Sequence, residues 1–159
     1  NEFDNNIIQY VREEFNMLIG EQLAEQVKIM IGSATPLKDS LVMQIRGRDL
    51  INGLPKAVEV SDSQIREAIG KTTYQIIESI KITLETTPPE LVSDIYEHGI
   101  ILTGGGALLR GLDKEIAQAA KIPVRIADDP LTCVVRGTGI LLDNAELLSK
   151  VIAPNTEEF

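Results

Sequence analysis

The sequence has no tryptophan, one cysteine and one histidine, and only 4% of its 159 residues are aromatic. With so few aromatic side chains, a folded core must be built mainly from Ile, Leu, Val and Ala. The lone Cys133 has no partner for an internal disulfide, which fits a reducing compartment such as the cytoplasm. A single histidine, His98, without a cysteine cluster gives no metal-ligand pattern, so we expect no metal site in this chain.

Long apolar runs and basic clusters are also missing. No stretch approaches the roughly 20 apolar residues that a membrane-spanning helix needs. The net charge is -9, and no stripe of Lys and Arg stands out against it. Because proteins that bind nucleic acids need clustered cations to displace counterions, we expect no nucleic-acid partner. What the chain does have is 43% hydrophobic residues, enough for one domain with a real core.

The most informative motif is an apolar, strand-like run that is followed by three consecutive glycines. Residues 100–102 are apolar, Gly104, Gly105 and Gly106 follow, and a helical pattern resumes from about Ala107, or starts anew at Gly111, and runs to Ala120. Glycine has no Cβ to obstruct a ligand, and a helix start offers unpaired N–H groups. The motif therefore indicates either a close backbone approach to a nucleotide or tight strand-to-helix packing, and the pattern alone leaves both open.

A polar stripe on an early helix is the second candidate. After Gly20, the spacing of Leu23, Val27, Met30 and Ile31 predicts a helix, and Glu21, Glu25 and Lys28 align on its other face. Glu25 and Lys28 are spaced as an i,i+3 ion pair, worth about 0.2–0.5 kcal/mol on a solvated surface. The alternative is a polar clamp on the hydroxyls or ring of a ligand.

Other local signals outline the remaining elements. Asp4 is expected to cap a first helix, and two alternating runs, residues 41–46 and 57–60, predict strands on either side of an Asn-Gly turn. Ser61 and Gln64 form a capping box for a long helix with an apolar stripe from Ile65 to Leu84. Thr87 is expected to cap a helix with Pro at its first position.

The second half of the chain alternates between strands and helices. A strand at residues 123–127 follows the helix after the glycines, and a further helix carries apolar residues from 131 to 142. This order predicts parallel strands with right-handed crossovers. Only about two strands are then left for the main lobe, whereas a typical sheet has roughly 4 to 6. We therefore expect the chain to be the C-terminal part of a longer protein.

Five segments resemble, in order, the C-terminal region of the MreB family of bacterial actin homologues. They are residues 18–34, 46–50, 88–91, 102–112 and 127–137. The resemblance implies an α/β, actin/heat-shock-chaperone ATPase-like fold, of which this chain is the C-terminal lobe with a small inserted α+β subdomain. Residues 1–35 and 70–153 would be an incomplete nucleotide-binding subdomain lacking its first strands, residues 36–69 the insertion, and residues 154–159 a tail.

The resemblance also assigns a nucleotide site to the two candidate motifs. ATP or ADP would contact two groups of residues, which should meet across one cavity: Glu25, Gln26, Val27 and Lys28 at the ribose or base, and Gly104, Gly105, Gly106 and Ala107 at the adenosine and α-phosphate side. Full-length members of the family are ATPases that use Mg²⁺. The phosphate-binding hairpins, the catalytic carboxylate and the Mg²⁺ ligands have no counterpart in this sequence, so we expect no catalytic residue here and no ATP hydrolysis by this chain alone.

Family membership would further imply filaments that maintain rod shape. The protein would associate with itself into protofilaments, with the small lobe near one end of the subunit. In its full-length form it would work with cell-elongation membrane proteins, in the cytoplasm at the inner face of the cell membrane. Two alternatives stay open: a chaperone-type ATPase of the same fold, and a non-catalytic actin-like interaction module.

Overall fold

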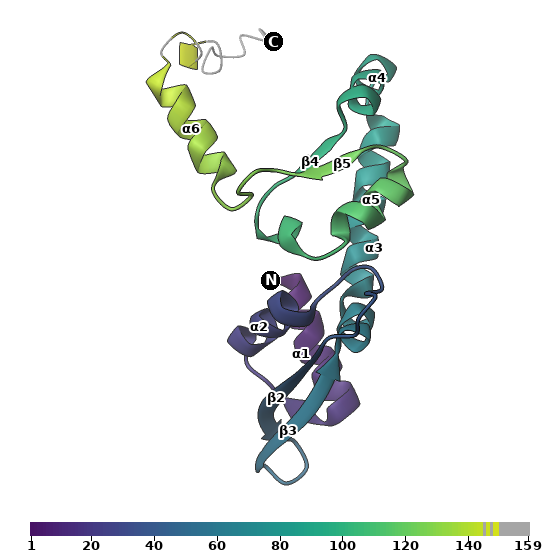
Figure 1. The fold of residues 1–159 in the computed structure, drawn as a ribbon, viewed down its shortest axis with the longest axis vertical. Coiled ribbons are helices and arrows are strands. Elements are labelled where there is room, and N and C mark those ends of the chain that lie inside the picture. Colours follow the sequence, from purple (N-terminus) through teal and green to yellow (C-terminus); the bar gives the residue numbers. More distant parts are fainter. Residues whose placement is uncertain (145, 147, 150–159) are drawn as a thin grey trace, which may run out of the picture.

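The computed structural model describes residues 1–144, 146, 148 and 149 of the chain. Figure 1 shows an elongated molecule in which helices α1 and α2 and an antiparallel sheet form one end. Helix α3, Asp62–Thr86, runs lengthwise from this end to the other, where α4, α5 and two short strands lie. The expected tail at residues 154–159 lies outside the described residues.

The N-terminal end begins with α1, Glu2–Phe15, followed by β1, Met17–Leu18, and α2, Glu21–Ile31. The prediction that Asp4 is the cap of α1 is wrong. Asn1 is the N-cap and Asp4 is the third helical residue of a capping box, because Asn1 accepts from the Asp4 N–H at 3.2 Å. Asn16 ends α1 in the left-handed conformation, and Gly32 ends α2.

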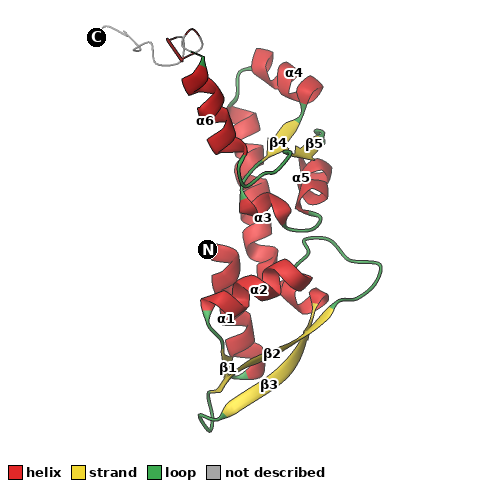
Figure 2. Ribbon diagram, turned by 60° about the vertical axis from the view of Figure 1, so that its left-hand side comes forward, coloured by secondary structure: helices red, strands yellow, loops and turns green. Residues whose placement is uncertain are grey.

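The sheet has the order β1-β2-β3 and is antiparallel throughout. Strand β2, Val42–Asp49, pairs with β3, Pro55–Ser61, so both predicted strands exist. Strand β2 starts and ends later than expected, and β3 is longer than expected at both ends. The loop between them is held by Asp49, whose Oδ1 accepts from the backbone N–H of Ile51 at 2.7 Å. Figure 2 shows this sheet with α1 and α2 on one side of it.

The capping box predicted for α3 is confirmed. The Ser61 side chain accepts from the Gln64 N–H, and the backbone N–H of Ser61 donates to Oε1 of Gln64 at 3.0 Å. The helix then continues without a break for 25 residues. It therefore crosses the expected subdomain boundary between residues 69 and 70.

The C-terminal end alternates helices with two short strands. They are α4, Pro89–His98; β4, Ile100–Leu102; the 3₁₀ turn η1, Gly105–Leu108; α5, Leu112–Ala120; β5, Val124–Ile126; and α6, Cys133–Asp143. The expected parallel pairing of β4 with β5 is confirmed. The predicted Thr87 cap of α4 is wrong, because the N-cap is Pro88 and the Thr87 hydroxyl donates to the Thr83 carbonyl at 2.6 Å.

One apolar core joins α1, α2, the sheet, α3 and α5. Its fully buried side chains include Ile7, Val27, Ile45, Ile65 and Ile69, each 0% exposed. Met30, predicted to face this core, is instead 59% exposed, because the buried face of α2 consists of Ala24, Val27 and Ile31. Helix α6 has no buried residue and extends away from the rest of the described chain (Figure 1).

The described helices include none that combines the length and the apolar character needed to cross a lipid bilayer.

Candidate functional site

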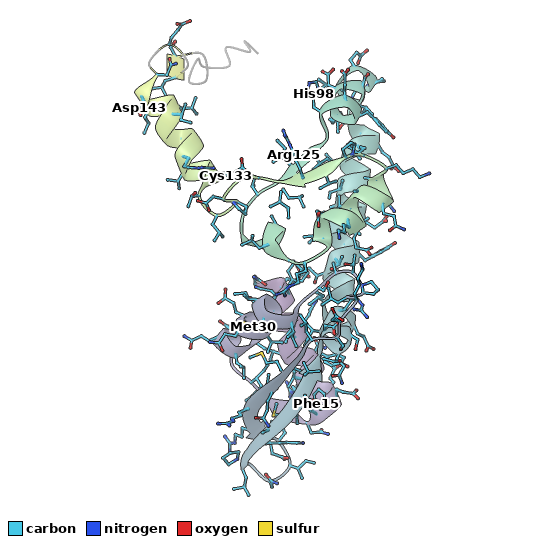
Figure 3. All side chains as sticks on the ribbon, viewed as in Figure 1. Phe15, Met30, His98, Arg125, Cys133 and Asp143 are labelled. Carbon is cyan, nitrogen blue, oxygen red and sulfur yellow. The ribbon has the colours of Figure 1, made fainter. Side chains whose placement is uncertain are left out.

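Helix α2 presents the first group of predicted site residues. Glu25 and Gln26 are exposed, Lys28 is partly buried, and Val27 is buried in the core. Val27 therefore packs α2 against the core, while the exposed side chains of Glu25 and Gln26 can contact a ligand. In Figure 3, Met30 marks the exposed last turn of the same helix.

Lys28 pairs with a different acid from the one that its spacing predicts. Its Nζ lies 2.8 Å from Oδ1 of Asp4 in α1, and no ion pair with Glu25 is found among the described residues. The Lys28 and Asp4 side chains are only 14% and 8% exposed. Burial alone raises the pKa of the Asp4 carboxyl, but the hydrogen bonds and charges of Lys28 and of the amino group of Asn1 together outweigh it and hold that pKa below its ordinary value of 3.8.

The second group lies in the segment between β4 and α5, and we call residues 104–107 the glycine turn. Gly104 has a φ of 78°, which L side chains rarely adopt, and its N–H donates to the Pro130 carbonyl at 2.7 Å. The α-helix does not start at about Ala107, where the turn is a short 3₁₀ segment. It begins at Leu112 after the left-handed Gly111 and ends at Ala120, which confirms the second start that the sequence indicates.

The glycine turn is open where a ligand would need space. A Cβ built on Gly106 has no atom within 4 Å, and one on Gly105 meets only Leu131 Cδ2 at 3.5 Å. Within the described residues, no oxygen accepts a hydrogen bond from the N–H groups of Gly105 and Gly106. Ala107, by contrast, is buried and anchors the turn. The turn thus combines free backbone donors with the absence of a side-chain barrier.

Arg110 joins the two groups. Its Nη1 donates to the carbonyls of Ile29 at 3.0 Å and Gly32 at 3.2 Å, which close the last turn of α2. Its own carbonyl accepts from the Ala34 N–H at 2.7 Å. Arg110, three residues after the glycine turn, is therefore held against the C-terminal end of α2, about 80 residues earlier in the chain. The cavity expected between the two groups of predicted site residues is not among the cavities described below.

Two cavities lie elsewhere, and none of the eight predicted site residues lines either of them. The larger, about 920 Å³, runs along α3 and includes Glu2, Ile95 and Ile100. The smaller, about 310 Å³, lies on α1 and includes Arg12 and Leu18. The larger is an uncovered apolar face, because the two strands β4 and β5 are too few to cover the length of α3.

Sequence reasoning missed Asp4 and Arg110 as parts of this arrangement. Asp4 carries a local signal, since its distance from Asn1 fits a capping box, but its ion pair with Lys28 depends on how α1 packs against α2. Arg110 lies three residues after the glycine turn and is the one cation in residues 100–112. Its partners are carbonyl groups, which the sequence does not display.

The described part of the chain holds no group of three or more His, Cys, Asp or Glu side chains placed to bind a metal ion. Residues of this part therefore offer no metal centre to the candidate site.

Comparison with known proteins matches residues 1–150 to the MreB/Mbl protein family. The cell shape-determining protein Mbl of Bacillus subtilis is 43% identical over 148 residues, which are 93% of this chain and 44% of Mbl. Among solved structures, MreB5 of Spiroplasma citri bound to ADP superposes with a TM-score of 0.88 at 40% identity, over 95% of this chain and 45% of MreB5. The same protein bound to AMPPNP gives a TM-score of 0.86 at 41% identity, over 91% of this chain and 43% of MreB5.

A more distant structure, the MamK double helical filament, is 22% identical with a TM-score of 0.75, over 91% of this chain and 44% of MamK. At that identity the likeness concerns the fold alone. The chain spans less than half of the length of each of these relatives.

Proposed function

The chain belongs to the MreB/Mbl family, and on that premise we propose that it is the C-terminal part of an ATP-binding, filament-forming, actin-like protein that maintains rod cell shape. The proposal is supported by the name of its relative Mbl, a cell shape-determining protein, and by the nucleotides in the MreB5 structures. ATP hydrolysis belongs to the whole protein in this proposal, because the chain covers 44% of Mbl.

The nucleotide site of the proposal consists of α2 and the glycine turn. Glu25, Gln26 and Lys28 provide polar contacts to the ribose or base, with Val27 behind them. Gly104, Gly105, Gly106 and Ala107 let the backbone approach the adenosine and α-phosphate side. The observation that carries this assignment is the open, donor-rich turn at Gly105 and Gly106, tied to the end of α2 by Arg110.

A valine at Gly106 tests the site without disturbing the fold. The position is open, so a larger side chain has space in the free protein but would occupy the volume of the nucleotide. We expect Gly106→Val to weaken binding of the fluorescent nucleotide mant-ADP to the full-length protein at least tenfold, measured by titration. The melting temperature should stay within about 2 °C of the unaltered protein, because no packing is lost.

Gly70→Val is the matched control. Gly70 lies in α3, and a Cβ there also has no atom within 4 Å, yet it belongs to neither the glycine turn nor α2. Its nucleotide affinity should be unchanged. Equal affinity for the Gly106 variant and the unaltered protein would overturn the site assignment. Absence of binding by the unaltered protein would favour the non-catalytic interaction module.

Mg²⁺ is part of the proposal through residues outside this chain. The cation would neutralise the phosphates of the bound nucleotide, and phosphoryl transfer depends on such neutralisation and on positioning. The chain's own residues would hold the nucleoside side. We further propose a cytoplasmic location at the inner face of the membrane, in contact with cell-elongation membrane proteins.

Self-association is the other half of the proposed function. The loop between β2 and β3 lies at one end of the elongated molecule (Figure 1), and its apolar side chains face solvent: Leu50, Ile51 and Leu54 are 45%, 81% and 62% exposed. An apolar tip at a molecular end suits a head-to-tail contact with a second subunit. We propose that it forms part of the longitudinal contact of a protofilament.

The subdomain division also remains a proposal. Residues 1–35 and 70–153 would form the nucleotide-binding subdomain and residues 36–69 the insertion, with further strands of the longer protein covering the apolar face along α3. The cavity of about 920 Å³ on that face supports this arrangement.

A further inference from the structure

The last turn of α2 is closed by a side chain from a remote segment. The final carbonyls of a helix have no intrahelical donor and carry the negative end of the helix dipole. The Arg110 guanidinium supplies the missing donor, with Nη1 at 3.0 Å from the Ile29 carbonyl and 3.2 Å from the Gly32 carbonyl. Its positive charge is also favourable at this end of the helix.

The backbone of Arg110 is fixed to the chain that leaves α2. Its carbonyl accepts from the Ala34 N–H at 2.7 Å and lies 3.3 Å from the hydroxyl of the fully buried Ser33. Ser33 and Arg110 form an isolated parallel bridge. Both the main chain and the side chain of Arg110 therefore bind the same few residues at the end of α2.

Ala107 is the one buried residue of the glycine turn, and the three glycines before it have little packing of their own to fix their position. A Cβ at Gly104 or Gly106 would meet no atom within 4 Å, so this stretch of backbone is unsupported on that side. It is held at its ends, by the hydrogen bond from Gly104 to Pro130 on one side and by Arg110 on the other. Leu109 and Leu112, both buried, keep the segment attached to the core when the Arg110 side chain is removed.

From these contacts we propose that Arg110 is a positioning residue that sets the register between the glycine turn and α2, and thereby the affinity for nucleotide. The inference rests on the proposed function and deepens it. A ligand that touches both elements needs them at a fixed separation, and a shift of about 1 Å between two such groups is enough to weaken binding. Arg110 does this without touching the ligand itself.

Full-length protein carrying Arg110→Ala tests the inference. We expect the dissociation constant for mant-ADP to rise about tenfold and the melting temperature to fall by a few degrees. Arg110→Met keeps the aliphatic stem and removes the donors, so it should show the same loss of affinity with a smaller change in packing. Arg110→Lys restores a cationic donor near the α2 carbonyls and should recover most of the affinity.

Lys56→Ala is the matched control, because Lys56 makes the same kind of contact at another helix. Its Nζ donates to the Phe15 carbonyl at the end of α1 at 2.7 Å and lies 3.4 Å from Oδ2 of Asp49, and none of these three residues belongs to the proposed site. We expect a similar fall in melting temperature and less than a twofold change in the dissociation constant. The contrast separates positioning of the site from general stability.

Unchanged nucleotide affinity in both Arg110→Ala and Arg110→Met would overturn the inference, as would an equal loss of affinity in the Lys56 variant. In those cases the unaltered protein still binds nucleotide and the proposed function stands. Failure of the unaltered protein to bind mant-ADP would overturn the proposed function and, with it, the role of Arg110.

Discussion

At the scale of single residues, the shielded ion pair between Asp4 and Lys28 joins the first two helices beside the proposed site. The depressed pKa of Asp4 means that the folded protein prefers its charged form. The carboxylate thus stabilises the fold above about pH 3.8, the ordinary pKa of the unfolded chain, and this contribution is lost as the pH falls through the lower folded pKa.

Asp4→Asn should therefore destabilise the protein near neutral pH. It removes the partner of a Lys28 side chain that is only 14% exposed, and breaking such a pair costs roughly 2 kcal/mol. Urea unfolding monitored by circular dichroism would measure the change at pH 7 and at pH 3. The difference between variant and unaltered protein should shrink at the lower pH. A constant difference at both values would show that the charge of Asp4 is not the cause.

The same pair shows where sequence reasoning stops. Spacing within one helix predicts Glu25 as the partner of Lys28, since i,i+3 neighbours are visible in the sequence. The actual partner lies 24 positions earlier, on α1, and follows from the packing of two helices. The candidate residues Glu25, Lys28 and Gly104–Gly106 could be named from motifs and family resemblance, whereas Asp4 and Arg110 depend on tertiary contacts.

At the scale of elements, α3 connects the two ends of the molecule and its start is locally encoded. The Ser61–Gln64 capping box satisfies helical N–H groups that would otherwise lack a partner, and Asp62 ties the same turn to Ser40 at 2.9 Å. Burial raises the pKa of the Asp62 carboxyl, but hydrogen bonds from Ser40 and the Leu41 N–H, with the charge of Arg66, hold it below its ordinary value.

Ser61→Ala should lower stability by about 1 kcal/mol, because it removes the N-cap acceptor of this helix. Thermal or urea unfolding measures the loss. Ser79→Ala is the control on the same helix: its hydroxyl only donates back to the Gln75 carbonyl on the exposed face, so stability should stay the same or rise slightly. Equal losses in both variants would contradict a specific capping role.

The start of a helix could be predicted from the sequence where a side chain caps it. The prediction failed where the backbone geometry determines the first helical residue. The capping box of Ser61 correctly predicts the start of α3 from the sequence. Thr87 is also a residue type that caps helices, yet its hydroxyl donates to the Thr83 carbonyl, and Pro88 is the N-cap of α4. The glycine turn has no side chain to place a helix start, and the left-handed Gly111, with φ 74°, moves the start of α5 to Leu112.

At the scale of the whole molecule, the chain has the actin-like ATPase fold of its MreB5 relatives, as the family resemblance predicts. The two ends of the molecule expose different apolar surfaces: the β2–β3 loop at one, and the face along α3 and the outer side of α6 toward the other. Composition alone indicates a core of aliphatic residues. It does not reveal which aliphatic side chains stay outside, because that depends on which partner surfaces the molecule meets.

Ile51→Lys should impair assembly without affecting folding. Ile51 is 81% exposed at the tip of the loop, so a charge costs the free subunit little but would be buried in a longitudinal contact. Sedimentation of the full-length protein with ATP should show a critical concentration raised at least tenfold. Ile51→Val keeps the apolar surface and should assemble normally. Normal filaments from the lysine variant would remove this loop from the contact.

The single cysteine of the sequence lies where a fluorescent label can be attached close to the glycine turn. Cys133 is partly exposed at the end of α6 that adjoins β5 (Figure 3), and its thiol contacts the Pro130 carbonyl, which also accepts from Gly104. A maleimide dye would react at this one thiol of the 159 residues, next to the glycine turn. On the proposed site assignment, its emission would change when nucleotide binds at the turn, without the engineering of a new attachment point.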